Sequence, residues 1–252
     1  MTRPAPLRPN PQWADEALAG AWRALERNVS PDLLPTPGEV RDSRVSFEDL
    51  GSGGWGTVMR TREHGTLLKL TTDPDEARFA AWSAGLDDWP AGCVRYLRAL
   101  DLGPGAHPSR PGAPVWALWR EEAFSVGEVI PNVDTNALPE AQARLLTALL
   151  AWRRVASFVR AAAVSPGADL RAILANAQVL LGRPAVSIGN APLGYPIGAA
   201  LSWMLDRGVL LPDTHAGNVG LVRRGGGLVA ALTDASGALF LCDRPPPMPG
   251  RI

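Results

Sequence analysis

The chain has 252 residues and is short of lysine and cysteine. Its two cysteines, Cys93 and Cys242, are too few for a disulfide framework or a structural zinc site. No apolar run approaches the ~20 residues of a membrane-spanning helix, and prolines interrupt the beginning of the chain, so neither a membrane span nor a signal peptide is expected. Basic and acidic residues number 25 each, so we expect no nucleic-acid and no membrane partner. A cytoplasmic protein with a sizeable core is the expectation.

The single lysine of the chain is informative because arginine is used everywhere else. Lys69 stands beside 24 arginines, which serve wherever a surface cation is needed. Lysine offers a compact point charge on a flexible stem, whereas arginine is a wide planar fork. The single lysine therefore indicates a position whose function an arginine side chain could not serve. The alternative is chance retention in an arginine-biased chain.

Two short apolar runs late in the chain, residues 219–222 and 228–232, flank the segment R-R-G-G-G. This pattern predicts a β-hairpin with a glycine-rich turn. Asp213 and Asn218 precede the first run and Asp234 follows the second, so the hairpin would bring the three side chains together. Two carboxylates and an amide oxygen suit Mg²⁺. The alternative is ordinary turn chemistry, since Asp, Asn and Gly populate turns anyway.

The spacing of Asp213 and Asn218 resembles the catalytic loop of the protein-kinase superfamily. The segment D-A-S-G, which begins at Asp234, loosely resembles the metal-binding turn of that family. The form D-x-H-x-x-N, without the H-R-D of protein kinases, is similar to the aminoglycoside- and choline-kinase-like branches. The resemblance implies that Asp213 is catalytic, that Asn218 and Asp234 bind metal, and that His215 braces the loop or has no catalytic role.

The segment L-G-S-G-G-W-G-T-V fits the glycine-rich loop G-x-G-x-x-G-x-V of kinases. A dinucleotide-binding loop would open a helix instead. In this chain, the side chains that follow the glycine segment alternate as in a strand. The chain then turns at His64 and Gly65 and resumes as a second strand, so a hairpin is predicted. The alternative is a glycine-rich hairpin without a ligand. The resemblance implies nucleotide binding by Gly51, Ser52, Gly53, Gly54, Trp55, Gly56 and Val58.

Lys69 follows in L-L-K-L, on the strand after the glycine segment, and this resembles the V-A-I-K strand of kinases. The resemblance implies that Lys69 is catalytic and holds the nucleotide phosphates. Glu76, in a helix predicted over residues 75–84, is the candidate for its ion pair, although it comes only seven residues later. Its alternative role is to stabilise the first turn of that helix. The resemblance also implies that residues near Glu121 to Ala123 bind adenine through their backbone.

Apolar periodicity predicts helices over residues 12–28, 138–163, 169–181 and 192–208, the last ending at Gly208. Further strands are expected over residues 94–102 and 114–121, with a surface turn between them. The predicted fold is α+β: a two-lobed protein-kinase-like fold with a five-stranded antiparallel sheet and one helix in the N-lobe, and a shortened, mainly helical C-lobe. The expected domains are an N-terminal arm at 1–44, the N-lobe at 45–125 and the C-lobe at 126–252.

The implied function is an ATP- and Mg²⁺-dependent phosphotransferase that moves the γ-phosphate to a hydroxyl of a protein or a small molecule. A close variant transfers the nucleotide instead. The alternative is a pseudokinase, a nucleotide-binding or scaffold module without turnover. Lys69, Asp213, Asn218 and Asp234 together favour the enzyme. The short chain after the D-A-S-G segment and the position of Glu76 favour the pseudokinase.

Overall fold

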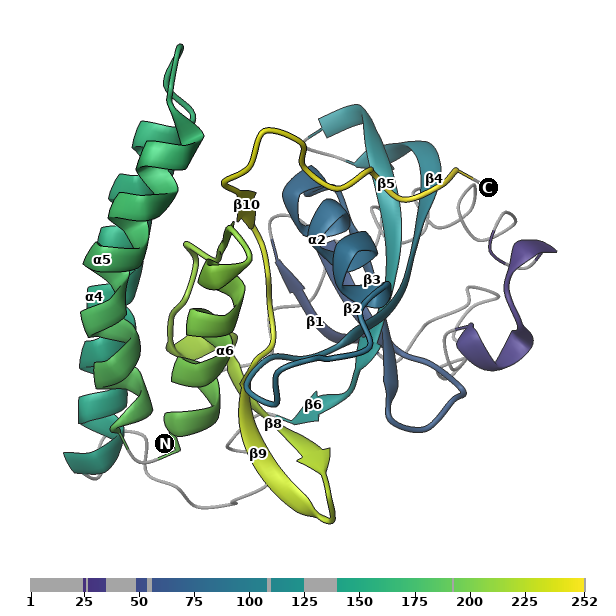
Figure 1. Ribbon diagram of the computed structural model, residues 1–252. Helices are drawn as coiled ribbons and strands as arrows, with labels where there is room; N and C mark the ends of the chain where they lie inside the picture. The colour runs from purple at the N-terminus through teal and green to yellow at the C-terminus, as the bar shows by residue number, and fades with distance from the viewer. Residues whose placement is uncertain are drawn as a thin grey trace, which may run out of the picture. The chain divides into compact units, whose positions relative to one another are not determined.

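The computed structural model describes residues 25, 27–34, 49–53, 56–107, 110–124, 140–191 and 193–251. Contacts divide the chain into two compact units, and Figure 1 shows the elements of both. The first unit contains the large sheet and comprises Met1–Asp73, Tyr96–Arg120 and Met248–Ile252. The second contains the helices and comprises Pro74–Arg95 and Glu121–Pro247.

The first unit is built on one sheet whose strands follow the order β1-β2-β3-β5-β4. Neighbouring strands β1–β2, β2–β3 and β4–β5 pair antiparallel, and helices accompany the sheets, which confirms the predicted α+β class. Gly65, with φ of +81°, makes the turn between β2 and β3, so the predicted hairpin is confirmed. The strands are β1 Asp49–Gly53, β2 Gly56–Arg60, β3 Thr66–Thr71, β4 Tyr96–His107 and β5 Arg110–Glu121.

Strands β4 and β5 run further than the sequence predicted. The prediction of a surface turn over residues 103–114 is wrong, because most of this segment is paired strand. Its glycines and prolines are typical of turns, but here they fall at irregularities of the ladder. Pro104 pairs with Pro114 between two register shifts, where the missing N–H groups of proline cost little.

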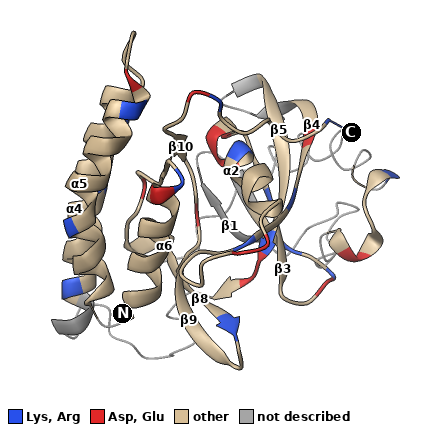
Figure 2. Cartoon of the chain, viewed as in Figure 1, with Lys and Arg blue, Asp and Glu red and all other residues tan. Residues whose placement is uncertain are grey.

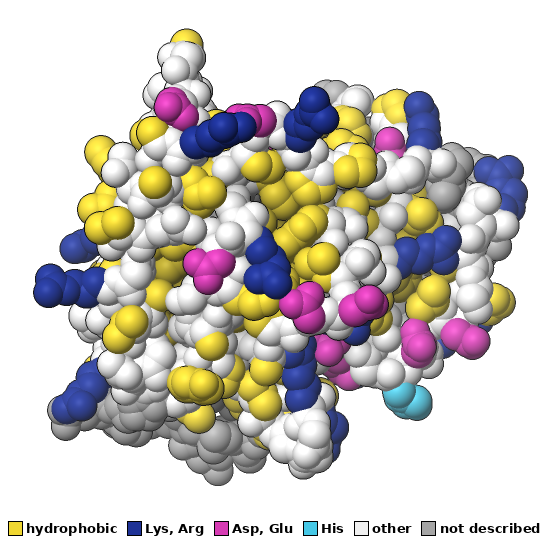
Figure 3. Space-filling model, in the orientation of Figure 1, with side chains coloured by type: hydrophobic (Ala, Val, Ile, Leu, Met, Phe, Trp, Pro, Cys, Tyr) yellow, Lys and Arg dark blue, Asp and Glu magenta, His cyan; other side chains and the backbone are white. Residues whose placement is uncertain are grey.

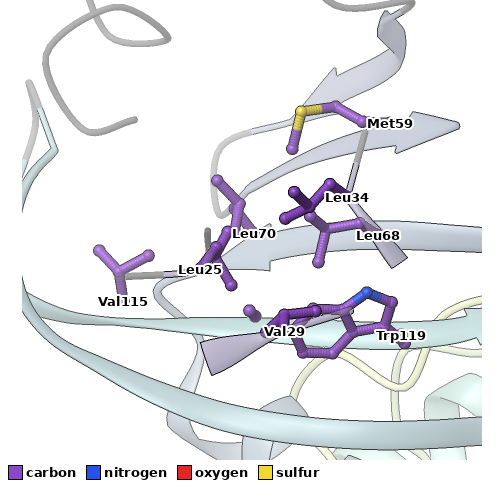
Figure 4. Close-up of a cluster of buried hydrophobic side chains, with 9 residues drawn as sticks. Leu25, Val29, Leu34, Met59, Leu68, Leu70, Val115 and Trp119 are labelled. Carbon is purple, nitrogen blue, oxygen red and sulfur yellow. The ribbon is translucent and has the colours of Figure 1, made fainter. Parts of the chain in front are cut away.

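The core of the first unit lies against this sheet (Figure 4). Trp119 of β5 is buried there, and its indole N–H donates to the carbonyl oxygen of Leu33 at 2.7 Å. Leu33 belongs to the 3-10 helix η1, Pro31–Leu33, so the N-terminal segment contributes to the core. The helix expected over residues 12–28 lies almost entirely outside the described residues. The buried members of the cluster are Leu25, Val29, Leu34, Met59, Leu68, Leu70, Val115, Ala117 and Trp119.

The second unit contains the helices α2 Pro74–Ala84, α4 Glu140–Ala163, α5 Leu170–Gly189 and α6 Tyr195–Asp206. Helices α4 and α5 lie side by side, with α6 next to α5 (Figure 1). All four begin within three residues of the predicted starts. The side chain of Asp169 caps α5 by accepting from the N–H groups of Arg171 and Ala172.

Helix α5 does not end at Leu181, as predicted, but continues to Gly189. The prediction was wrong because Gly182 and Pro184 are typical helix-ending residues. Pro184 removes one helical hydrogen bond, yet it faces the protein interior together with Ala185 and Ile188. Burial of this face offsets the lost bond.

Helix α2 is fixed to the second unit by aromatic packing. Phe79 and Trp82 of α2 meet Trp89, Trp203 of α6 and Phe240, with ring centroids 5.5 to 6.0 Å apart. Tilted and edge-on arrangements of this kind favour aromatic pairs beyond the area that they bury. These contacts therefore group α2, the helix that carries Glu76, with the second unit, which also contains the hairpin of residues 219–232.

Short strands complete the second unit, and two of them form the hairpin that the sequence predicts near the end of the chain. Strands β8 Val219–Arg224 and β9 Gly227–Leu232 form this antiparallel hairpin, as predicted. Strand β6, Ala123–Phe124, extends it on the β8 side. Strand β7, Val209–Leu210, pairs with β10, Leu239–Phe240.

Gly208, with φ of +71°, ends helix α6 as predicted, and its N–H donates to the carbonyl oxygen of Leu205. No helix among the described residues is both long and apolar enough to cross a membrane. Acidic and basic residues are interspersed along the described parts of the chain (Figure 2), and side chains of both signs stand among apolar ones on the face in Figure 3.

Candidate functional site

The loop that contains Asp213 is held from behind by buried hydrogen bonds. The carbonyl oxygen of Leu211 accepts from the hydroxyl of Thr214 at 3.0 Å and from the indole N–H of Trp152, in α4, at 2.9 Å. Leu211 and Thr214 are buried, as is Trp152. Because buried hydrogen bonds of this kind are costly to break, the backbone that leads into Asp213 is fixed.

Asp213 and Asn218 are joined directly. The side-chain Nδ2 of Asn218 donates to the backbone oxygen of Asp213 at 2.8 Å. Between them, the 3-10 helix η2, Ala216–Asn218, closes the loop, and Nδ1 of His215 accepts from the N–H of Gly217 at 3.0 Å. His215 Nε2 lies 3.7 Å from Asp213 Oδ2. His215 thus lies close to both Asp213 and Gly217 within the loop, and its bracing role stays a prediction.

The β8–β9 hairpin brings Asp234 to this loop. Val219 pairs with Leu232 at the base of the hairpin, and one step further the N–H of Thr233 donates to the backbone oxygen of Asn218 at 2.8 Å. Asp234 follows directly. Its Oδ1 accepts from the backbone N–H and the hydroxyl of Ser236, at 2.8 and 2.7 Å. The three predicted oxygen-bearing residues therefore lie on neighbouring, mutually hydrogen-bonded segments.

The chemistry of Asn218 and Asp234 fits a magnesium ion. Because Nδ2 of Asn218 is engaged with Asp213, the amide oxygen is the atom that this side chain offers to a cation. A carboxylate and an amide oxygen are hard ligands, and Mg²⁺ bound with a nucleotide takes few ligands from the protein. Within the described part of the chain, no group of three or more His, Cys, Asp or Glu side chains is arranged to hold a metal. A nucleotide-borne metal is what this pair suits.

Two arginines of α4 reach the site, and the sequence did not predict either of them. Arg153 Nη2 lies 3.0 Å from Asp213 Oδ1, with 47% and 39% of the two side chains exposed. Arg160 Nη2 lies 3.3 Å from Oδ2 of Asp75, the residue before Glu76. With 24 arginines in the chain, no sequence signal marks these two. Both contacts join segments that are far apart in the sequence.

The predicted phosphate-binding residues lie in the first unit. Lys69 is buried on β3 and is the register partner of Val58 on β2. Gly51 pairs in turn with Val58, and Gly53 with Gly56, so the glycine segment and the lysine occupy adjacent strands of one sheet. Ser52 lies on β1 between these glycines. The predicted residues Gly54 and Trp55 lie outside the described residues.

Glu76 and Glu121 belong to the second unit. Glu76 is fully buried in the first turn of α2, and its pairing with Lys69 stays a prediction. The carboxylate of Glu121 accepts from the N–H of Arg95 at 2.8 Å and forms an ion pair with Arg224. The backbone N–H of Glu121 donates to Arg95 at 2.9 Å. That N–H is therefore engaged, and any backbone contact with adenine would come from another group of the segment.

No protein-family model and no curated protein sequence matches the chain. Among solved structures, the chain is similar to one described as the crystal structure of the Mycobacterium tuberculosis PknI kinase domain. The TM-score is 0.34 and the sequence identity is 14%, and the match covers 80% of this chain and 62% of that chain. The chain thus spans less than two thirds of the length of that kinase domain.

Proposed function

We propose that the protein binds ATP with Mg²⁺ and transfers the γ-phosphoryl group to a hydroxyl of a small molecule or a protein. The observation that supports this is that hydrogen bonds join the segments that carry Asp213, Asn218 and Asp234. Asn218 is tied by its side chain to Asp213 and through its backbone to Thr233, the neighbour of Asp234. A catalytic carboxylate beside two oxygen ligands is the arrangement that phosphoryl transfer needs.

Each residue has a distinct role in this proposal. Asp213 would orient the acceptor hydroxyl and take its proton as the new bond forms. Asn218 and Asp234 would hold the metal ion, which supplies charge neutralisation at the phosphate oxygens when it is bound. Lys69 and the glycine strands would hold the triphosphate. Catalysis of this kind is mostly positioning, which can account for roughly 7–11 kcal/mol of a barrier.

A second candidate function is a nucleotide-binding or scaffold module without turnover, and a specific contact favours it. Arg153 forms an ion pair with Asp213 at 3.0 Å. This guanidinium competes for the carboxylate that must accept the proton of the acceptor. In a scaffold, the same ion pair would only stabilise the loop.

The two functions are separated by incubating the protein with Mg²⁺ and ATP labelled at the γ-phosphate. Asp213→Asn keeps the shape of the side chain but loses the proton acceptor. Asp243→Asn is the matched control, because Asp243 is an exposed carboxylate that also pairs with an arginine, Arg171. We expect hydrolysis or self-labelling with the wild type and with Asp243→Asn, and a loss of roughly a hundredfold or more with Asp213→Asn.

Equal label in the wild type and Asp213→Asn would exclude the catalytic role of Asp213. Saturable ATP binding with no released or transferred phosphate in any of the proteins would support the module without turnover. Label transferred from the α-position instead of the γ-position would identify nucleotide transfer.

A further inference from the structure

Helix α4 contacts three segments of the second unit: the loop of Asp213, the first turn of α2 and the turn that follows Asp234. Near its middle, Trp152 hydrogen-bonds the backbone before Asp213, and Arg153 pairs with Asp213 itself. Two turns later, about 11 Å along the helix, Arg160 pairs with Asp75 at the beginning of α2. Trp152 is fully buried, and so is Ala156 between the two contact points. The position of α4 is therefore fixed.

Arg160 also lies against the turn that begins at Asp234. A β-carbon added to Gly237 would stand 2.6 Å from Arg160 Nη1 and 3.4 Å from its Cζ. The guanidinium thus occupies the space beside the glycine where another residue would have its side chain. Gly237 has φ of +68°, a conformation that favours glycine. One guanidinium therefore contacts both the Asp234 turn and the first turn of α2.

We propose that Arg160 is a positioning residue that fixes the first turn of α2, and with it Glu76, relative to the turn of Asp234. This inference rests on the proposed binding of ATP and Mg²⁺. The planar fork of arginine presents two donor edges at once: Nη2 faces Asp75, and Nη1 faces Gly237. A lysine at this position would keep the charge but could not contact both partners.

The proposal has a consequence for regulation. In protein kinases, the position of the helix that carries the conserved glutamate is controlled by the phosphorylated activation segment. Here the first turn of α2 is held by Arg160, and the rest of the helix is held by the aromatic contacts of Phe79 and Trp82. Glu76 is thus kept in the unit of Asp234 without any modification.

A positioning role can be separated from a role in stability because the ion pair is partly exposed. The side chains of Arg160 and Asp75 are 43% and 30% exposed, and ion pairs at this exposure contribute little to folding. Removing the guanidinium should therefore leave the melting temperature nearly unchanged. Its effect should appear in the binding of nucleotide with metal, since partners that orient ligating segments typically change metal affinity by about 10–100-fold.

The test compares Arg160→Gln and Arg160→Lys with the control Arg171→Gln, which removes an exposed arginine–aspartate pair on α5. The readouts are the Kd for ATP measured with and without Mg²⁺, and the melting temperature. We expect both Arg160 variants to weaken ATP binding about tenfold or more with Mg²⁺. Binding without Mg²⁺ should change much less, and Arg171→Gln should match the wild type.

Asp75→Asn completes the test as a double-mutant cycle. It should reproduce the loss seen with Arg160→Gln, and the double variant should lose no more than either single variant, because both remove the same contact. Wild-type affinity in Arg160→Gln, an equal loss in Arg171→Gln, or a loss that follows a lowered melting temperature would overturn the positioning role. Failure of the wild type to bind ATP with Mg²⁺ would instead overturn the proposed function.

Discussion

Arg153 is the side chain that sets the charge beside Asp213. Its guanidinium lies 3.0 Å from Oδ1, and His215 Nε2 lies 3.7 Å from Oδ2, so the carboxylate is held from two sides. In a phosphotransferase, these two contacts would orient Asp213 as the proton acceptor. We expect Arg153→Gln to lower the rate of γ-phosphate release about tenfold while leaving the Kd for ATP unchanged, because misplacement of a catalytic group affects mainly the chemical step.

The control for this prediction is Arg154→Gln, which removes the same charge from the next position of α4, where the side chain is also exposed. Phosphate release measured for the two variants separates a local effect from a general change in charge. A faster reaction in Arg153→Gln would show that the ion pair restrains Asp213 and does not help to orient it.

Asn218 has two functions that a pair of substitutions can separate. Its Nδ2 donates to the Asp213 backbone oxygen, and its remaining oxygen is the candidate metal ligand. Asn218→Ala and Asn218→Asp both lose the hydrogen bond, so both should lower the free energy of unfolding by about 1–2 kcal/mol. Only Asn218→Asp keeps an oxygen for the metal, and it should retain more affinity for ATP with Mg²⁺. Urea unfolding and nucleotide titration measure the two effects, and equal affinity in both variants would exclude a role of Asn218 as a ligand.

The sequence was informative where a residue type was rare or a spacing was fixed. The hairpin pattern correctly predicted that Asp234 returns to the loop of Asp213 and Asn218. The single lysine drew attention to Lys69, whose role in phosphate binding stays a prediction. The partners of Asp213 could not be predicted in the same way. Arginine is abundant in the chain, and a contact between α4 and the loop depends on packing that no local pattern encodes.

Among the elements, the crossing of α5 and α6 depends on a glycine. A β-carbon on Gly198 of α6 would stand 2.6 Å from the backbone nitrogen of Gly189 and 2.7 Å from the backbone oxygen of Ala185. Both are backbone atoms of α5, which cannot move cheaply. We expect Gly198→Ala to destabilise the protein by about 1–3 kcal/mol, as measured by chemical denaturation.

Gly182→Ala is the matched control, because Gly182 also lies within a helix, α5, but has nothing within 4 Å of an added β-carbon. Alanine favours helix by about 1 kcal/mol over glycine, so this variant should be slightly more stable than the wild type. The two glycine-to-alanine changes should thus have opposite signs. Equal effects would mean that the backbones of α5 and α6 are further apart at Gly198 than these distances.

The boundaries that the sequence predicted poorly have a common cause. Pro184 within α5 and Pro104 and Pro114 within β4 and β5 are local signals for an end, and in each case packing or pairing continues the element. Helices α2, α4 and α6, which contain no proline beyond their first turn, were predicted to within a few residues. Local propensity is therefore reliable here only where tertiary contacts agree with it.

At the scale of the whole molecule, the sequence did not indicate that the contacts of α2 group it with the second unit. The helix follows directly after the strand of Lys69, and the kinase resemblance places it in the same lobe. The contacts of α2 with Trp203 and Phe240, more than a hundred residues later in the chain, and with Arg160 group it with the second unit. The division of the chain into units follows these distant contacts.

The end of the chain returns to the first unit and covers part of an exposed sheet edge. Strand β4 is the outer strand of the sheet, and its Asp101 N–H donates to the backbone oxygen of Gly250 at 3.0 Å. Asp101 and Arg251 form an isolated parallel bridge. Arg251 Nη2 also lies 2.8 Å from the position that a β-carbon on Gly103 would take.

A chain that stops at Pro247 should therefore be less stable. Loss of the bridge and of the Arg251 contact should lower the free energy of unfolding by about 1–2 kcal/mol, which corresponds to a fall in melting temperature of about 2–4 °C for each kcal/mol. Arg251→Ala keeps the backbone hydrogen bond and should lose less. An uncovered outer strand is also a template for pairing with another chain, so the truncated protein should associate at high concentration when followed by light scattering. An unchanged melting temperature and no added association would mean that residues 248–252 do not protect this edge in solution.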